Sequence, residues 1–129
     1  MKVKLHYILG SFFLSLPMQA QDLECRDNLS IYDGYVKTKN YKEAYAPWKE
    51  VYGNCPELHW ANFSYGERIL SYKIDQSTTK NQKLDYINDL LKLYDNSIEY
   101  FPQKITKEEV IIKKVLLSYT HNMMASDKI

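Results

Sequence analysis

The two cysteines are the residues of this chain whose chemistry their positions define best. Cys25 and Cys55 are its only cysteines. The apolar pattern places Cys25 at the start of one expected helix and Cys55 just past the end of the next, and these two ends meet in an antiparallel hairpin. In an oxidising compartment such a pair forms a disulfide, worth roughly 3 to 4 kcal/mol for a loop of about this length. The alternatives are two free buried thiols or a metal-binding pair.

The remaining reactive side chains do not form a recognisable centre. The histidines are His6, His59 and His121, and no histidine or third cysteine stands at zinc-ligand spacing. His121 suits the negative end of a helix better than the role of a base. The chain has no Gly-rich phosphate loop, paired-histidine motif or nucleophile elbow. We therefore expect no metal, no cofactor and no catalysis.

The composition favours helices. The chain has 129 residues with 17 basic and 16 acidic side chains, and only four glycines and four prolines. Scarce turn residues argue against an all-β fold, so we expect an all-α domain. Twelve tyrosines suit helix seams and binding faces alike, since each buries a ring and keeps a polar tip. Because no basic cluster stands out, we expect no nucleic-acid partner.

The first twenty residues have the pattern of a secretory signal peptide. Lys2 and Lys4 precede an apolar run over 5–18, and Ala20 offers a small residue for cleavage. The alternative is a transmembrane anchor, for which the run is short. We expect cleavage near Ala20, no stable membrane insertion afterwards, and a periplasmic or secreted protein of residues 21–129.

The mature chain opens with an expected helical hairpin over about 23–54. Its first helix is preceded by Asp22 as a capping residue, and a turn follows at Lys39. Asn40 caps the second helix, with Glu43 as its partner in a variant capping box. Pro47 lies inside that helix and predicts a kink.

A second expected hairpin spans about 57–100. Gly66 permits close packing in its first helix, and the polar residues 75–83 predict a long loop. Thr79 with Gln82 suits a capping box for the next helix. That helix should end before Phe101, because the residue preceding a proline avoids helical geometry.

A fifth expected helix covers about 107–121, after a capping box formed by Thr106 and Glu109. Its run of β-branched residues also fits a strand, but the cap favours a helix. It is apolar nearly all round and therefore needs neighbours on two sides. We expect the chain to be part of a longer protein, or to pair with another chain.

The stretch 40–56 resembles the second half of a tetratricopeptide (TPR) repeat. Asn40 to Ala44 stand at the family's turn, Trp48 at its aromatic position and Pro56 at its closing proline. Tyr32 departs from the pattern, since a glycine or alanine is usual there, and Trp48 is bulkier than typical. These departures imply looser packing or a non-standard repeat.

The resemblance extends over about residues 24–120 and is weaker in the second hairpin, where Tyr65-Gly66 and Pro102 carry it. The whole chain is also similar to the N-terminal part of secreted TPR-like proteins of Bacteroidota. They share its Tyr-x-x-Ala-Tyr-x-Pro-Trp-x-x-Val-Tyr run followed by Cys-Pro.

The resemblance also implies a binding face. In a TPR array the first helix of each pair lines the concave surface, and Trp60 and Phe63 would be its aromatic anchors. The alternative is that both rings simply pack in the core. The implied face carries Arg26, Leu29, Asp33, Lys37, Trp60, Phe63, Glu67 and Ser71.

We therefore expect a non-catalytic helical-repeat scaffold that binds a protein or peptide. One alternative is the helical N-terminal part of a larger secreted enzyme or assembly. Another is a small helical bundle that self-associates through its fifth helix.

Overall fold

The chain folds into α-helices throughout the region that the structure describes. A computed structural model describes residues 16–122, and this range contains no β-strand. The all-α prediction is therefore confirmed, and the strand alternative for the last element is excluded. The elements are α1 (Leu16–Lys37), α2 (Tyr41–Asn54), the short 3₁₀ helix η1 (Pro56–Leu58), α3 (Ala61–Asp75), α4 (Lys80–Tyr100) and α5 (Lys107–Thr120).

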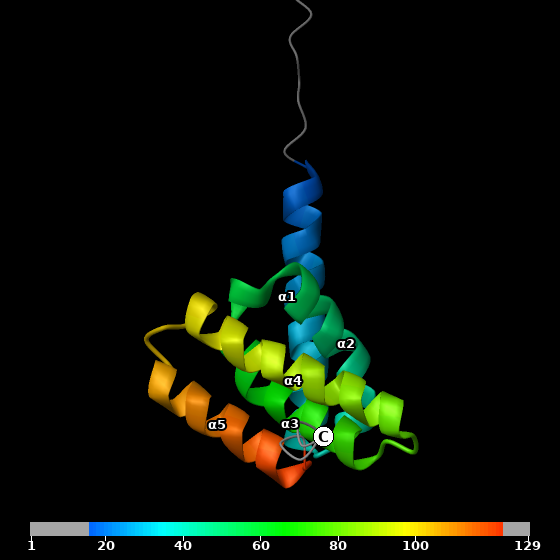
Figure 1. Ribbon diagram of the computed structural model, residues 1–129. Helices are drawn as coiled ribbons and strands as arrows, with labels where there is room; N and C mark the ends of the chain where they lie inside the picture. The colour runs from blue at the N-terminus through cyan, green and yellow to red at the C-terminus, as the bar shows by residue number, and fades with distance from the viewer. Residues whose placement is uncertain (1–15, 123–129) are drawn as a thin grey trace, which may run out of the picture.

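The helices pack as successive hairpins (Figure 1). The most extensive contacts join α1 to α2 and α3 to α4, and α2 also packs on α3. α5 lies along α4 at the edge of the molecule. The third helix of the fold is therefore enclosed by its neighbours, and the fifth has a neighbour on one side.

A single apolar core runs through the hairpins, from Cys25 in α1 to Val110 in α5. Its residues recur at the three- and four-residue spacing of an amphipathic helix. The largest fully buried side chains are Tyr32, Ile69, Leu70, Ile74, Ile87, Leu90 and Leu93.

Three helices begin at residues whose side chains satisfy their first N–H groups. Asn40 Oδ1 accepts from the Glu43 N–H at 3.5 Å, and Thr79 Oγ1 from the Gln82 N–H at 3.2 Å. Thr106 forms both halves of a capping box with Glu109. The three caps are confirmed, because each offers an oxygen to a donor with no partner inside the helix. Of the three predicted capping boxes, only the one at Thr106 forms both halves, and Gln82 Oε1 instead accepts from the Thr78 N–H at 3.2 Å.

Several predicted boundaries need correction. The loop expected over 75–83 is confined to 76–79, because the Thr79 cap lets the polar residues after it form the exposed first turn of α4. The second hairpin opens with η1 before α3 begins at Ala61. Asp22 lies inside α1 instead of capping it, and its carboxylate accepts from Arg26 Nε at 3.0 Å.

Most of the predicted signal peptide lies outside the described residues, which begin at Leu16. α1 runs from Leu16 across the predicted cleavage point near Ala20. No helix within the described range is long and apolar enough to cross a membrane.

At the contact between α2 and α3, the large side chain of Trp48 packs against Gly66, which has no side chain. A Cβ atom added to Gly66 would lie 2.8 Å from Trp48 Cζ2. Trp48 also stacks on Tyr52, with ring centroids 5.2 Å apart. Gly66 therefore has the close-packing role expected of it, and the bulk of Trp48 produces a tight seam here.

Candidate functional site

The two cysteines are joined. Cys25 and Cys55 form a disulfide with a Cα–Cα distance of 6.4 Å. Cys25 is buried in α1, and Cys55 directly follows α2. The predicted pairing is confirmed, and the alternatives of free thiols and of a metal-binding pair are excluded for these residues.

Asn62 connects the disulfide region to three helices. Its side chain has no solvent exposure. Asn62 Nδ2 donates to the Cys55 and Pro56 carbonyls at 3.0 and 3.1 Å, while its Oδ1 accepts from Tyr32 Oη at 2.5 Å. Its backbone carbonyl accepts from Trp48 Nε1 at 2.8 Å. Because Tyr32 belongs to α1, Trp48 to α2 and Asn62 to α3, these hydrogen bonds fix the relative positions of the three helices.

A pocket of about 480 Å³ lies where α3, α4 and α5 meet. Its volume lies within the usual range of ligand-binding pockets in proteins, and it can hold one or two amino-acid side chains. Apolar residues and serine hydroxyls share the lining with three charged side chains. The lining consists of Trp60, Phe63, Ser64, Glu67, Arg68, Ser71, Leu93, Tyr94, Ser97, Ile105 and Lys113.

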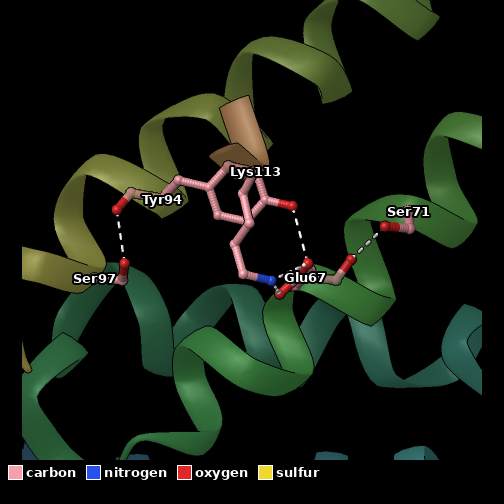
Figure 2. Close-up of polar contacts among 5 residues, drawn as sticks. All are labelled: Glu67, Ser71, Tyr94, Ser97 and Lys113. Carbon is pink, nitrogen blue, oxygen red and sulfur yellow. Dashed lines mark hydrogen bonds and ion pairs between the residues drawn. The ribbon is translucent and has the colours of Figure 1, made fainter. Parts of the chain in front are cut away.

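Glu67 is the polar centre of this pocket (Figure 2). Its carboxylate accepts from Lys113 Nζ at 2.8 and 3.0 Å and from Tyr94 Oη at 3.0 Å. Lys113 Nζ also lies 5.5 Å from the centroid of the Tyr94 ring. One residue from each of α3, α4 and α5 thus meets at a single carboxylate.

The environment of Tyr94 keeps its hydroxyl protonated. Burial raises the pKa of Tyr94, and the negative charge of Glu67 and the hydrogen bond to it raise that pKa further. Tyr94 therefore acts as a hydrogen-bond donor at neutral pH. It does not have the lowered pKa that proton abstraction by a tyrosine requires.

The serine hydroxyls near Glu67 are also engaged. Ser71 Oγ donates to the Glu67 backbone carbonyl at 2.7 Å, and Ser97 Oγ donates to the Tyr94 carbonyl at 2.6 Å. Neither hydroxyl has a base placed to activate it among the contacts drawn in Figure 2. The arrangement holds three helices together and offers a polar wall to a bound molecule.

Phe63 and Trp60 differ in the surface that they present. Phe63 is 2% exposed, and its ring contacts those of Tyr52, Trp60, Tyr100 and Phe101 at centroid distances of 5.5 to 6.0 Å. Trp60 is half-buried. Phe63 therefore forms the pocket floor as part of the core, while part of the Trp60 ring stays accessible at the pocket.

Arg68 is the exposed cation of the pocket. Its guanidinium lies 5.5 Å from the centroid of the Tyr65 ring, and it has no ion-pair partner within residues 16–122. Lys113, in contrast, is held by Glu67. Arg68 is thus the charge most available to an acidic group on a bound molecule.

The predicted residues of α1 lie apart from this pocket. Arg26 pairs with Asp22 at 3.0 Å, and Lys37 pairs with Asp33 at 2.6 Å, both on the exposed surface of α1. The hydrogen bond to Asp33, together with its charge, raises the pKa of Lys37. The candidate set is therefore divided: Trp60, Phe63, Glu67 and Ser71 share one pocket, and Arg26, Asp33 and Lys37 do not line it.

A second hollow, of about 260 Å³, is lined by Leu29, Ser30, Asp33, His59 and Ala61. It brings a serine, an acid and a histidine together. His59 Nδ1, however, accepts from the Ala61 N–H at 3.0 Å, and Asp33 holds Lys37. No hydrogen bond joins Ser30, Asp33 and His59 in the described region, so a catalytic triad is not assembled here. Nor do residues 16–122 contain a metal-binding group of histidine, cysteine, aspartate and glutamate side chains.

Sequence reasoning missed several members of the pocket, chiefly Arg68, Tyr94 and Lys113. Lys113 is 46 residues from Glu67 in the sequence, so no local pattern marks the pair. Asn62, which is buried next to the disulfide, was also missed. Its signal was a polar side chain among the apolar residues at the start of a helix.

The fold and its pocket define an all-helical protein of paired antiparallel helices, tied by one disulfide within the described residues. Comparisons with protein-family models, curated proteins and solved structures find no match. The TPR resemblance therefore stays a prediction.

Proposed function

We propose that this chain is a non-catalytic helical-repeat scaffold that binds a protein or peptide in the periplasm or outside the cell. The pocket between α3, α4 and α5 is the observation that carries the proposal. Its apolar floor suits a hydrophobic side chain, and the half-buried Trp60 offers the type of surface that dominates interface energy. Polar groups line its wall.

The charges of the pocket select the kind of segment that it accepts. Glu67 is neutralised by Lys113, so Arg68 gives the pocket a net positive character. An apolar side chain next to an acidic group in a peptide matches both features, because guanidinium recognises carboxylate through paired hydrogen bonds. The disulfide supports the proposed location, since such bonds persist in oxidising compartments.

A peptide library displayed on phage tests the proposal directly. Peptides selected on the immobilised chain would be measured against Trp60→Ala and Arg68→Ala, with Arg26→Ala on α1 as the matched control. We expect each pocket variant to weaken binding at least about tenfold, which corresponds to about 1.4 kcal/mol. Arg26→Ala should leave binding unchanged, because Arg26 does not line the pocket.

Two results would count against this proposal. If no library peptide binds in a way that depends on Trp60 or Arg68, the pocket is not a peptide site. If Arg26→Ala weakens binding as much as Arg68→Ala, the partner lies along α1 instead.

A further inference from the structure

Among residues 16–122, the outer face of α5 is the largest apolar surface that the fold leaves uncovered. Five of its side chains are more than half exposed, and they lie on one side of the helix. They are Ile111 at 53%, Ile112 at 58%, Val115 at 52%, Leu116 at 59% and Tyr119 at 74%. Together they expose on the order of 500 Å², at the upper end of what a monomer usually leaves open.

The opposite face of α5 is already used. Val110 is buried and Leu117 packs against the core. Lys113 is held by Glu67, and Lys114 Nζ lies 2.7 Å from Asp95 Oδ1. Both lysines are therefore paired within the monomer and turned toward α3 and α4. The five exposed residues therefore form an apolar stripe along α5 that contains no charged side chain. Glu108 lies at the N-terminal end of this stripe.

The stripe is self-complementary when two copies of α5 run antiparallel. A two-fold axis between Val115 and Leu116 places Val115 opposite Leu116 and Ile112 opposite Tyr119 of a second copy. Ile112, Val115 and Tyr119 also have the three- and four-residue spacing of a helix seam. An isologous contact requires this match of a surface to itself.

We propose that a second copy of this chain covers α5, through an antiparallel α5–α5 contact. Two such faces, fully covered, bury about 1,000 Å², which is the lower limit of area for a specific interface. The formal net charge of the chain is only +1, so two copies repel each other weakly. The second α5 lies on the side of α5 that α4 leaves open, at the edge of the molecule (Figure 1).

The contact is independent of the pocket proposed as the peptide site. Lys113 and Glu67 lie on the inner side of α5, so a second copy on the outer side leaves them in place. Failure of one proposal therefore says nothing about the other.

Sedimentation equilibrium of the chain, as purified from its cells, tests the proposal. We expect a mass that rises to twice that of one chain over a micromolar concentration series. Leu116→Glu should raise the dissociation constant at least about tenfold, since two glutamates would meet near the axis. Ile31→Glu is the matched control, because Ile31 is 49% exposed on α1, and it should leave the dimer intact.

Cysteine cross-linking tests the direction of the contact. Val115→Cys should form an intermolecular disulfide, because the two copies of position 115 adjoin the axis. Ile112→Cys should not, since its two copies lie about 10 Å apart along the helices at 1.5 Å per residue.

The outcomes separate clearly. A wild-type chain that stays monomeric throughout the series overturns the proposal and leaves α5 to a different partner. A dimer that survives Leu116→Glu, with helix content unchanged by circular dichroism, shows that another surface is used. Efficient cross-linking at position 112 overturns the antiparallel arrangement.

Discussion

α3 and α5 are similar in length and in apolar character, yet the fold treats them differently. α3 covers Ala61–Asp75 and buries seven residues, namely Ala61, Asn62, Phe63, Gly66, Ile69, Leu70 and Ile74. α5 covers Lys107–Thr120 and buries Val110 alone. The difference lies in the neighbours: α3 packs on both α2 and α4, whereas α5 packs mainly on α4.

An apolar helix is therefore buried on all sides only where the fold supplies a packing surface on each of them. α3 also carries the polar contacts that specify its position, through Asn62 at one end and Glu67 in the middle. α5 is attached by two lysine–carboxylate pairs and a narrow apolar edge. We therefore expect substitutions in α3 to affect the stability of the whole domain, and substitutions in α5 to act locally.

Asn62→Ala should have the largest effect. It leaves the buried Tyr32 hydroxyl and the Pro56 carbonyl without their partner and opens a cavity. The expected loss is about 4 kcal/mol of unfolding free energy, measured by urea denaturation. Asn96→Ala is the matched control, because it breaks one half-buried bond to Tyr52 and should cost about 1 kcal/mol. Equal losses for the two variants would mean that Asn62 does not organise the α1–α3 region.

Gly66→Ala should cost less, about 1 to 2 kcal/mol. The new Cβ would lie under 3 Å from the Trp48 ring. That ring cannot move easily, because Trp48 donates to the Asn62 carbonyl and stacks on Tyr52.

Gly34→Ala is the opposite case, since a Cβ added at Gly34 would have no neighbouring atom within 4 Å outside the backbone of its own helix. It should stabilise α1 by about 0.5 to 1 kcal/mol, because alanine favours helix over glycine. Thermal unfolding followed by circular dichroism would compare the two, and a stabilising Gly66→Ala would disprove the tight seam.

Thr106→Ala should destabilise the protein less than Asn62→Ala does, by about 1 kcal/mol, with the effect confined to the start of α5. The backbone N–H of Thr106 and its side chain lower the pKa of the Glu109 carboxyl below its ordinary 4.5. Since the folded-state pKa is lowered, the cap stabilises above pH 4.5 and weakens as pH falls through the folded value.

A carboxyl-carbon NMR titration would measure this pKa in both proteins. In Thr106→Ala the pKa of Glu109 should rise only part of the way to 4.5, because the backbone N–H of residue 106, the larger cause of the lowered pKa, is kept. Hydrogen exchange should quicken in α5 alone. Faster exchange spread through α3 as well would contradict the local character assigned to α5.

Local residue patterns determined the helices and much of their connection. The caps at Asn40, Thr79 and Thr106 were readable because a cap acts on an N–H only three residues away. The pairing of Cys25 with Cys55 followed from the expected hairpin, since the start of one helix and the end of the next meet in an antiparallel pair. The apolar all-round pattern of the fifth helix also indicated a shortage of neighbours, and its outer face is indeed exposed.

Only the tertiary structure decided which side chains share a site. The carboxylate of Glu67 meets Tyr94 and Lys113 because three helices converge, and contacts at 27 and 46 residues of separation leave no periodic trace in a sequence. The same packing kept Arg26, Asp33 and Lys37 out of the pocket and placed Phe63 in its floor. Periodicity reports which face of a helix is apolar, but the position of neighbouring helices determines whether that face becomes core, pocket or open surface.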